Sequence, residues 1–451
     1  MAAEVREGVD ESTQQAIAAQ LDAAVADLHG QVRDSQDSSG IVSAEVPAEA
    51  ADDLEAALDD IDGLGAVTQP ALFTLSRRPS DPQFRLQRSY LSDVAVPRAW
   101  NRARGRSATT IAVIDSGAAT SHPDLRGKVV GTRNAVFGGG DVRDRIGHGT
   151  AVASVAAADT SNRAGIAGVG WRTSVLAVKV ADRRGRIWGD ALARGIRWAT
   201  GQGADVINLS LGSTQDDPLV RQAVAYAVAN DVVVVAAVSN RGMSTPVYPA
   251  SYPGVLAVGA SRGDSVAPFS DRGSVVDVMA PGVGIRAAVP GGYSRVDGTS
   301  FASAVVAGQA SLIRSSRPRM SASRVTSTIL GTSQRIGDAA ASGQRVQVFN
   351  SVVRALGIPR VPRRVTATAG ATSVAVAWRA PRVMGRGDLV RYRIHVREIG
   401  EPWRIAARVG PRRTQASIDG LTAGAGHAVK VVAVSTVGAG LHSAPVQVRT
   451  G

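Results

Sequence analysis

The sequence predicts an α/β domain with a mostly parallel sheet flanked by helices, placed between a small α+β segment and a carboxyl-terminal β-sandwich. Three observations support this fold class. Apolar runs without polar alternation recur through the middle of the chain, as expected for strands buried on both faces of a sheet. Segments with helical periodicity separate these runs. After a proline-bearing stretch, short strands with alternating apolar and polar residues take over.

The same patterns divide the 451 residues into four parts. They are a small acidic α+β segment at 1–76, the parallel α/β domain at 77–355, a linker at 356–361 and the β-sandwich at 362–451. In the first part, periodicity predicts helices at 12–28 and 48–61 and strands at 40–47 and 71–75.

The middle and last parts contain the clearest strand signals. In the middle part the continuous apolar runs predict strands at 109–115, 174–180, 205–211, 232–238 and 254–260. Helices are expected between them at 150–158, 189–200 and 217–229. In the last part the alternating runs predict strands at 373–381, 391–398 and 427–435.

Composition and charge exclude several classes of function. The sequence has no cysteine, so disulfides and cysteine-based metal or redox sites are ruled out. No apolar run is long enough to span a membrane. The net charge of +13 combines −14 in residues 1–75 with +27 in the rest, which suggests that the two parts dock on each other. Aromatic residues make up 4% and the arginines are scattered, so we expect no nucleic-acid binding.

Three residues with catalytic potential stand at the ends of predicted elements in the middle part. Asp115 ends the strand in "AVIDSG", His148 begins a helix in "DRIGHGTAVA", and Ser300 follows Gly298 in "VDGTSFASAVVAG". A serine nucleophile needs an imidazole base, and the imidazole needs a carboxylate to orient it. Taken singly, each residue also fits a structural role: Asp115 in a turn, His148 at a helix start, and Ser300 as a helix cap.

The order Asp, His, Ser and the motifs around these residues resemble the subtilisin-like (subtilase) serine protease family. The similarity lies in "IAVIDSGAATSHPDL", "DRIGHGTAVA", "INLSLG", "VVAAVSNRG" and "GTSFASAVVAG", and it covers roughly residues 80–355. The resemblance implies that Ser300 is the nucleophile, His148 the general base and acid, Asp115 the residue that orients His148, and Asn240 an oxyanion donor.

The resemblance also implies a substrate-binding region. The matching positions are Ser210, Leu211, Gly212, Ala237, Val238 and Ser239. The chain departs from the family pattern at three places: Phe301 replaces a common Met, Ala304 replaces a Pro, and Ala237-Val238-Ser239-Asn240 replaces Ala-Ala-Gly-Asn. The departures at Val238 and Ser239 leave the preferred residue before the cut open. The spacing of "GVGIRA" (282–287) fits a dinucleotide-binding turn, but Pro290 follows too soon for the helix that such a site needs.

A structural calcium ion is a further expectation from the family. The matching positions are Asp124 in the His-Pro-Asp-Leu motif, Asn162 in the loop after the His148 helix, and Asp81. Oxygen ligands suit this hard cation. Each of the three residues can also be read as part of a solvated turn. His122 is expected to be structural, because it is tied to the turn before Pro123.

The two flanking parts resemble domains that accompany such proteases. The first segment is similar to the family's inhibitor-type propeptide, although its polar residues 1–11 predict that the usual opening strand is missing. The resemblance implies an intramolecular inhibitor removed by autocleavage near 75–80. The tail resembles a fibronectin type III domain through Trp378 and residues 420–440, with His427 where that family usually has a tyrosine.

We therefore expect a secreted, monomeric serine endopeptidase that acts on proteins or peptides and is made as a zymogen. No signal peptide is visible in the sequence, so either an upstream stretch is absent or the protein stays inside the cell. Two alternatives remain open at this point. One is an inactive subtilase-like binding protein, and the other is an intracellular protease with a regulatory amino-terminal segment.

Overall fold

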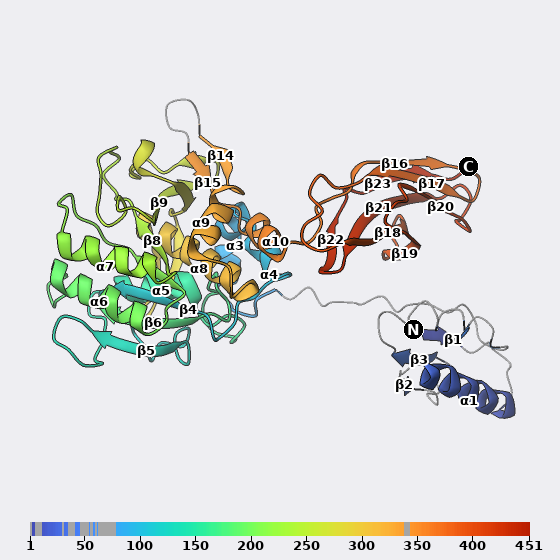
Figure 1. The fold of residues 1–451 in the computed structure, drawn as a ribbon, viewed down its shortest axis with the longest axis horizontal. Helices are drawn as coiled ribbons and strands as arrows, with labels where there is room; N and C mark the ends of the chain where they lie inside the picture. The colour runs from blue at the N-terminus through green and yellow to red at the C-terminus, as the bar shows by residue number, and fades with distance from the viewer. Residues whose placement is uncertain are drawn as a thin grey trace. The chain divides into compact units, whose positions relative to one another are not determined.

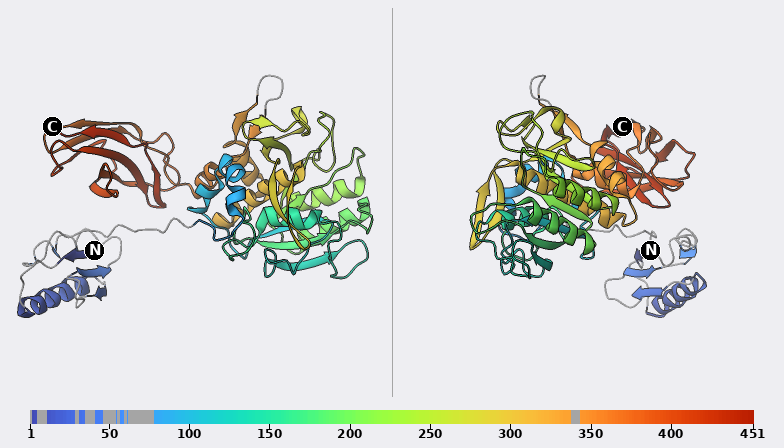
Figure 2. Two further views of the ribbon diagram at one scale, coloured as in Figure 1. Left: turned by 180° about the vertical axis from the view of Figure 1, so that it is seen from behind. Right: turned by 60° about the vertical axis from the view of Figure 1, so that its left-hand side comes forward.

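The computed structural model describes residues 2–4, 11–28, 31–34, 41–45, 54, 57–58, 61, 78–337 and 343–451. The chain divides into two compact units, Met1–Ser76 and Arg77–Gly451 (Figure 1, Figure 2). The second unit holds both the α/β sheet and the antiparallel strands of the tail, and each part is described below by itself.

The first unit combines one helix with a three-stranded antiparallel sheet. Helix α1 spans Glu11–Asp27, close to its predicted range, and the sheet order β1-β3-β2 places Ala2–Glu4, Ile41–Glu45 and Gln31–Asp34 side by side. The prediction that the opening strand is missing is wrong, because β1 pairs with β3. Strand pairing uses backbone N–H and C=O groups, so a polar segment can still form an edge strand.

The core of the first unit joins α1 to the segment that follows the sheet. Three apolar residues of α1, each about one turn from the next, are Ile17, Leu21 and Val25. They pack against three apolar residues that are also spaced as in a helix, namely Leu54, Leu58 and Ile61. Most of the helix predicted at 48–61 and all of the strand predicted at 71–75 lie outside the described residues.

The central sheet of the second unit is mostly parallel, which confirms the predicted fold class. Its strands lie in the order β14-β15-β11-β9-β8-β7-β4-β6-β5, and β10 pairs with β9. Every neighbouring pair from β15 to β5 is parallel, whereas β14 and β10 are attached in antiparallel fashion. The strands are β4 (Thr110–Asp115), β5 (Val129–Asn134), β6 (Ser174–Lys179), β7 (Val206–Leu209), β8 (Val233–Ala237), β9 (Val255–Arg262), β10 (Ser265–Val266), β11 (Val278–Pro281), β14 (Gln334–Ile336) and β15 (Gly343–Arg345).

Helices cover both faces of this sheet, and the strands alternate their side chains between two cores. In β4, Ile111 and Val113 join the core that contains α5 and α8, whereas Ala112 and Ile114 join the core beneath α6 and α7 (Figure 1). This alternation explains why the strands appear as continuous apolar runs. The helices are α5 (His148–Ala157), α6 (Gly189–Gly201), α7 (Pro218–Ala229) and α8 (Thr299–Ser316).

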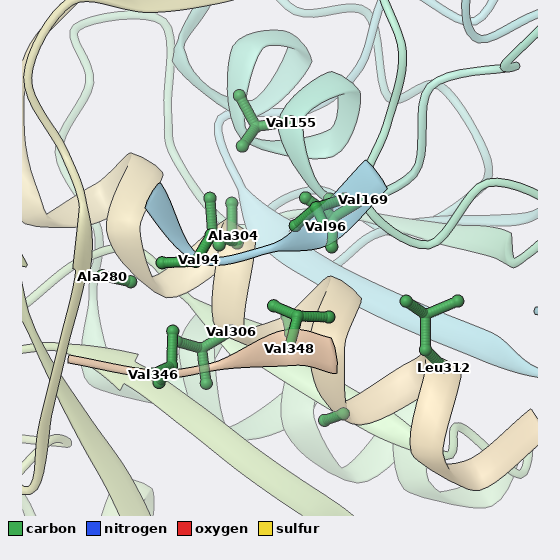
Figure 3. Packing of buried hydrophobic residues seen from close by; sticks show 14 of the residues in the cluster. Val94, Val96, Val155, Val169, Ala280, Ala304, Val306, Leu312, Val346 and Val348 are labelled. Carbon is green, nitrogen blue, oxygen red and sulfur yellow. The ribbon is translucent and has the colours of Figure 1, made fainter. Parts of the chain in front are cut away.

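Helix α8 is buried along almost its whole length. Its residues are buried without interruption from Thr299 to Ser315, which requires the small side chains seen in the sequence. Figure 3 shows Ala304 and Val306 of this helix among Val94, Val155 and Val346. Ala304, which departs from the family pattern, is therefore a core residue.

Shorter elements complete the α/β part. They are α3 (Phe84–Asp93), α4 (Val96–Trp100), α9 (Ala322–Leu330), α10 (Val348–Leu356), the 3-10 turn Gly273–Val275, and the antiparallel hairpin of β12 (Ile285–Val289) and β13 (Gly292–Val296). Residues 282–287 run into this hairpin and not into a helix, so the dinucleotide-binding reading is correctly rejected.

The tail consists of two antiparallel sheets that enclose their own core. One has the order β16-β17-β20 and the other β19-β18-β21-β22, with β23 paired to β21. Trp378 and Tyr392 lie in the core between them, with ring centroids 5.1 Å apart. The strands are β16 (Arg363–Ala369), β17 (Val374–Arg379), β18 (Leu389–Glu398), β19 (Arg404–Val409), β20 (Gln415–Ile418), β21 (Gly426–Ser435), β22 (Gly438–His442) and β23 (Val446–Arg449).

Candidate active site

Strand β4 delivers Asp115 to the carboxyl edge of the sheet. Asp115 shares the orientation of Ile111 and Val113, so it points to the side of the sheet where α5 and α8 pack. Its Oδ1 accepts a hydrogen bond from the backbone N–H of Ser116 at 2.6 Å and lies 2.8 Å from Nδ1 of His148. Asp115 is buried, whereas the His148 side chain keeps 35% of its exposure. The two residues, 33 positions apart, therefore form a partly buried pair that faces solvent through the imidazole.

Asp144 organises the start of the helix that carries His148. Its Oδ1 accepts from Ser116 Oγ (2.9 Å) and from the N–H groups of Ile146 (3.0 Å) and Gly147 (2.8 Å). Its Oδ2 accepts from the N–H (2.9 Å) and the hydroxyl (2.6 Å) of Thr150. Burial opposes the charged form of Asp144, but these hydrogen bonds outweigh it and lower its pKa. Asp144 was not predicted as a site residue, although it begins the "DRIGHGT" motif.

Glycine allows the two backbones to approach each other at this point. A Cβ on Gly149 would lie 2.2 Å from the carbonyl oxygen of Gly117 and 3.1 Å from Cβ of Asp115. Helix α5 can therefore rest directly on the turn after β4, as its flanking glycines suggested. This close packing fixes the distance between His148 and Asp115.

The electrostatics of His148 suit a base that works near neutral pH. Burial disfavours its charged form, but the charge and hydrogen bond of Asp115, together with the charge of Asp144, outweigh this and raise its pKa above 6.5. The ring of Phe301 lies beside the imidazole, with centroids 5.8 Å apart. The Phe301 side chain thus shields one side of the imidazole.

Ser300 lies in the first turn of α8, but it does not cap the helix. The N-cap position is Gly298, with φ at 151°, and no side chain supplies a capping hydrogen bond from there. The Ser300 hydroxyl instead donates to the main-chain oxygen of Ser210 at 3.3 Å. The capping interpretation of Ser300 is therefore wrong, because its hydroxyl points toward the end of β7 and away from the free N–H groups of α8.

Asn240 lies beside the same helix terminus. Its Oδ1 accepts a hydrogen bond from the N–H of Thr299 at 2.9 Å, which orients the amide. Its Nδ2 lies 3.4 Å from the point where a Cβ on Gly298 would stand. The amide donors of Asn240 and the N–H groups at the start of α8 consequently border the same space next to Ser300.

A pocket of about 360 Å³ opens next to Ser300. It brings together all six predicted substrate-binding residues, namely Ser210, Leu211, Gly212, Ala237, Val238 and Ser239. Asn240 and Ser300 also line it, together with five residues that the sequence analysis did not single out: Ser213, Thr214, Arg241, Val247 and Thr299. A hydrogen bond connects the pocket wall to the start of α8, because Ser210 Oγ donates to the main-chain oxygen of Ser300 at 2.9 Å.

Ser239 in the pocket wall has a backbone conformation that favours glycine. Its φ is 148°, a value that a residue with a Cβ rarely adopts. The departure from the family's Gly at this position therefore carries backbone strain. The Ser239 hydroxyl accepts a hydrogen bond from Nε of Arg241 at 3.2 Å, which partly offsets that cost.

The three residues predicted to hold calcium lie together at another place in the domain. Asp81 accepts the N–H of Ser161 through both carboxylate oxygens (3.0 and 2.8 Å), and Asn162 Nδ2 donates to Asp124 Oδ1 at 3.2 Å. Burial, with the nearby charge of Asp124 in addition, raises the pKa of Asp81 to about 6. Burial likewise raises the pKa of Asp124. Within the described ranges, neither carboxylate forms a salt bridge with a basic side chain.

Two buried, mutually repelling carboxylates of this kind fit a divalent cation. The fit of Asn162 is poorer, because its Oδ1 accepts from the N–H of Ala164 at 2.7 Å and its amide would have to turn to present oxygen. Among the residues that the structure describes, no group of three or more histidine, aspartate or glutamate side chains could hold a metal. His122 has a structural role, since its Nδ1 accepts from the N–H of Asp124 and Nε2 lies 3.1 Å from the Gly292 oxygen.

Comparisons with known proteins agree with this arrangement. The model of the subtilase family matches residues 106–355, and that of the fibronectin type III domain matches 360–449. Thermitase from Thermoactinomyces vulgaris is 42% identical over 260 residues, which cover 57% of this chain and 92% of thermitase. Subtilisin DY from Bacillus licheniformis is 43% identical over 234 residues, covering 51% and 84% of the two chains. The solved structure of a protease from Pseudoalteromonas arctica matches with a TM-score of 0.58 and 29% sequence identity. The match covers 62% of this chain and 100% of that protease chain.

No helix within the described ranges is long and apolar enough to cross a membrane.

Three findings agree on the family of this chain. They are the sheet order, the grouping of the Asp, His and Ser motifs at the carboxyl edge of the sheet, and a family match over more than half of the chain. The chain belongs to the subtilase family of serine proteases and carries a fibronectin type III domain after the protease domain.

Proposed function

We propose that the protein is a serine endopeptidase in which Ser300, His148 and Asp115 form the catalytic triad. The observation that supports this most strongly is the 2.8 Å contact between His148 Nδ1 and Asp115 Oδ1. The imidazole also lies beside the ring of Phe301, the residue that follows Ser300. Asp115 accepts a hydrogen bond from the Nδ1–H of His148, which holds the proton on Nδ1 and leaves Nε2 of the imidazole as the base. We assign the catalytic domain to residues 77–355, the linker to 356–361 and the tail domain to 362–451.

Acyl transfer accounts for the role of each residue. Ser300 turns from the Ser210 oxygen toward His148, and its Oγ attacks the carbonyl carbon of the substrate while His148 Nε2 takes the hydroxyl proton. The oxyanion that forms receives hydrogen bonds from Asn240 Nδ2 and the N–H of Ser300. The C–N bond then breaks, and the amine leaves with the proton from His148.

Water completes the reaction by the same route. His148 takes a proton from the water as its oxygen attacks the acyl-enzyme, and it returns the proton to Ser300 Oγ when the acid product leaves. The residue before the scissile bond occupies the pocket formed by residues 210–212 and 237–239. Backbone groups of these segments are available to bind an extended peptide next to Ser300.

Covalent labelling separates this function from that of an inactive binding protein. A peptidyl phosphonate should label folded, processed enzyme at Ser300, as located by mass spectrometry, because only a serine activated by a base reacts with it. Ser300→Ala should abolish labelling and peptide hydrolysis. Processed protein that folds but neither reacts nor cleaves a panel of peptides would refute the proposal.

We further propose that residues 1–76 are an inhibitory propeptide, released by autocleavage near residues 75–80. The support is its compact fold, which has its own core, and its charge of −14 beside +27 in the rest of the chain. Ser300→Ala protein should accumulate at full length, and segment 1–75 added to mature enzyme should inhibit it less as salt rises. Normal processing of Ser300→Ala without added protease would show that cleavage is not autocatalytic.

Calcium is proposed as a structural ion held by Asp81 and Asp124, with Asn162 after rotation of its amide. The ion would neutralise the two buried carboxylates and would take no part in proton transfer. Calcium should raise the melting temperature of the Ser300→Ala protein, and more at pH 8 than at pH 5, because protons compete for Asp81 near its pKa of about 6. Asp124→Asn should remove the increase, and an equal increase in that variant would exclude the site.

The remaining assignments concern the cellular setting. We propose that the protease is secreted and acts as a monomer on protein or peptide substrates, with the propeptide as its first partner. The sandwich domain is expected either to bind a polymer or a partner, or to act as a spacer, and its fold alone does not decide between these two roles. Fractionation of the native host with an antibody to residues 362–451 should detect the mature enzyme in the medium, and retention in the cells would favour a regulatory intracellular protease.

A further inference from the structure

Among the described residues that line the pocket beside Ser300, one side chain carries a formal charge. Of its thirteen lining residues, twelve are uncharged at neutral pH and the remaining one is Arg241. The uncharged wall includes Leu211, Ala237, Val238 and Val247, which favour an aliphatic stem. A substrate side chain that enters this pocket therefore meets apolar walls and one positive charge.

Hydrogen bonds hold the Arg241 guanidinium at the pocket. Nε donates to Ser239 Oγ at 3.2 Å, and Nη2 donates to Thr245 Oγ1 at 3.2 Å. Because its position is fixed before substrate arrives, little side-chain entropy is lost when a substrate carboxylate binds. Among the described residues, no hydrogen bond engages Nη1, so donors of the guanidinium remain for a ligand.

A buried carboxylate lies next to Arg241. Asp271 has no exposed surface, and its Oδ2 lies 3.7 Å from Nη2 of Arg241. Its Oδ1 accepts instead from the backbone N–H groups of Arg241 (3.2 Å) and Met243 (3.0 Å). The Arg241 side chain keeps 38% of its exposure, so its positive charge faces the pocket while the carboxylate stays on the protein side.

We infer that Arg241 makes this pocket select an acidic side chain, in particular glutamate, at the substrate residue before the scissile bond. This inference rests on the proposed peptidase function. A carboxylate can form charge-assisted hydrogen bonds with the guanidinium, whereas a lysine or arginine would be repelled by it. The aliphatic part of glutamate would lie along the apolar wall.

The expected preference is moderate. Exposed charge pairs contribute only a few-fold, but closure of the pocket by substrate removes water and strengthens the pair. We expect kcat/KM for a peptide with glutamate at this position to exceed that for glutamine by about tenfold at low ionic strength. Glutamine has the same shape as glutamate, so this ratio measures the effect of charge alone.

The experiment compares mature enzymes on peptides that differ only at the residue before the cut, with glutamate, glutamine, lysine and methionine. In wild type the Glu/Gln ratio should be about ten at low salt and fall as salt rises, and methionine should exceed lysine. Arg241→Gln should bring the Glu/Gln ratio to about one, and Arg241→Lys should retain most of it. Arg262→Gln, an exposed arginine of β9 outside this pocket, should leave the ratio unchanged.

The site of self-processing gives an independent readout. Within the predicted window, cleavage after Arg77 or Arg78 would place a positive side chain against Arg241, whereas cleavage after Leu75 or Ser76 would not. Sequencing of the mature amino terminus in wild type should therefore find cleavage after an uncharged residue of the window and not after Arg77 or Arg78. Arg241→Glu should shift it toward 77 or 78.

Two results would overturn the inference while leaving the peptidase function intact. One is hydrolysis of the glutamine and methionine peptides with a Glu/Gln ratio of one or less in wild type. The other is a ratio above one that persists in Arg241→Gln, which would assign the preference to other groups. If no peptide is cut and the phosphonate leaves Ser300 unlabelled, the proposed function itself fails and the inference fails with it.

Discussion

Replacement of Asp144 by asparagine tests how the start of α5 is held. Asp144 is buried and accepts five hydrogen bonds, three on Oδ1 and two on Oδ2. Asparagine has nearly the same shape, but its amide nitrogen cannot accept. If its oxygen takes the place of Oδ1, the nitrogen faces the N–H and the hydroxyl of Thr150, and both donors lose their acceptor.

The magnitude follows from those two bonds. A buried donor that loses its acceptor costs about 1–3 kcal/mol, so we expect Asp144→Asn to lower the free energy of unfolding by about 4 kcal/mol. For a domain of this size that corresponds to a fall of about 12 °C in melting temperature. Since hydrogen bonds hold the pKa of Asp144 low, the ionised carboxylate stabilises the fold above about pH 4, and this contribution is lost as pH falls through the lowered pKa. The difference between wild type and variant should shrink only in that acidic range.

Differential scanning calorimetry in the Ser300→Ala background provides the measurement, because that background prevents self-digestion. The matched control is Asp141→Asn in the same loop, where an exposed carboxylate accepts one bond, from the N–H of Arg143 at 3.0 Å. The control should change stability by less than about 0.5 kcal/mol. The reasoning fails if Asp144→Asn stays within about 1 kcal/mol of the parent, or if both substitutions cost the same.

Four further predictions concern the site. The acidic limb of the kcat/KM profile should have its midpoint above pH 6.5, because the raised pKa of His148 keeps the base protonated below it, and Asp115→Asn should lower that midpoint and reduce kcat by about 10⁴. Asn240→Ala should lower kcat by about 10²–10³ with little change in KM in steady-state assays, because one oxyanion donor typically contributes that much to stabilising the transition state; a change confined to KM would exclude that role. Ser239→Gly should raise the unfolding free energy by about 1 kcal/mol in denaturant titrations, because relief of strain at φ 148° exceeds the lost bond to Arg241, and destabilisation would contradict the strain argument. Phe301→Met should make amidase activity sensitive to peroxide, whereas wild type should stay active; equal losses would reject the idea.

The fold class and the three motifs were accessible from the sequence because their signals are local. A strand buried on both faces is apolar at every position, so the run that ends at Asp115 identified β4 within one residue. The same is true of the small residues of α8, which a fully buried helix requires. The secondary-structure propensity and the burial of these elements depend on the residue type at each position. Both can therefore be predicted from the sequence without knowledge of the tertiary contacts. The edge strand β1 was missed because backbone pairing leaves no apolar pattern in the side chains.

Only the tertiary structure decided what the side chains at the site do. The Ser300 hydroxyl bonds to Ser210, 90 residues away, so its sequence context could not exclude a helix cap. Arg241 is one arginine among many in the sequence, and it becomes the charged side chain among the described lining residues of a pocket only when β7, β8 and the start of α8 converge. The physical reason is that a hydrogen bond or a charge acts over a few ångströms in space, whereas the parallel sheet brings the carboxyl ends of distant strands to one edge. The sequence thus determined which elements form, and their packing determined which groups face one another.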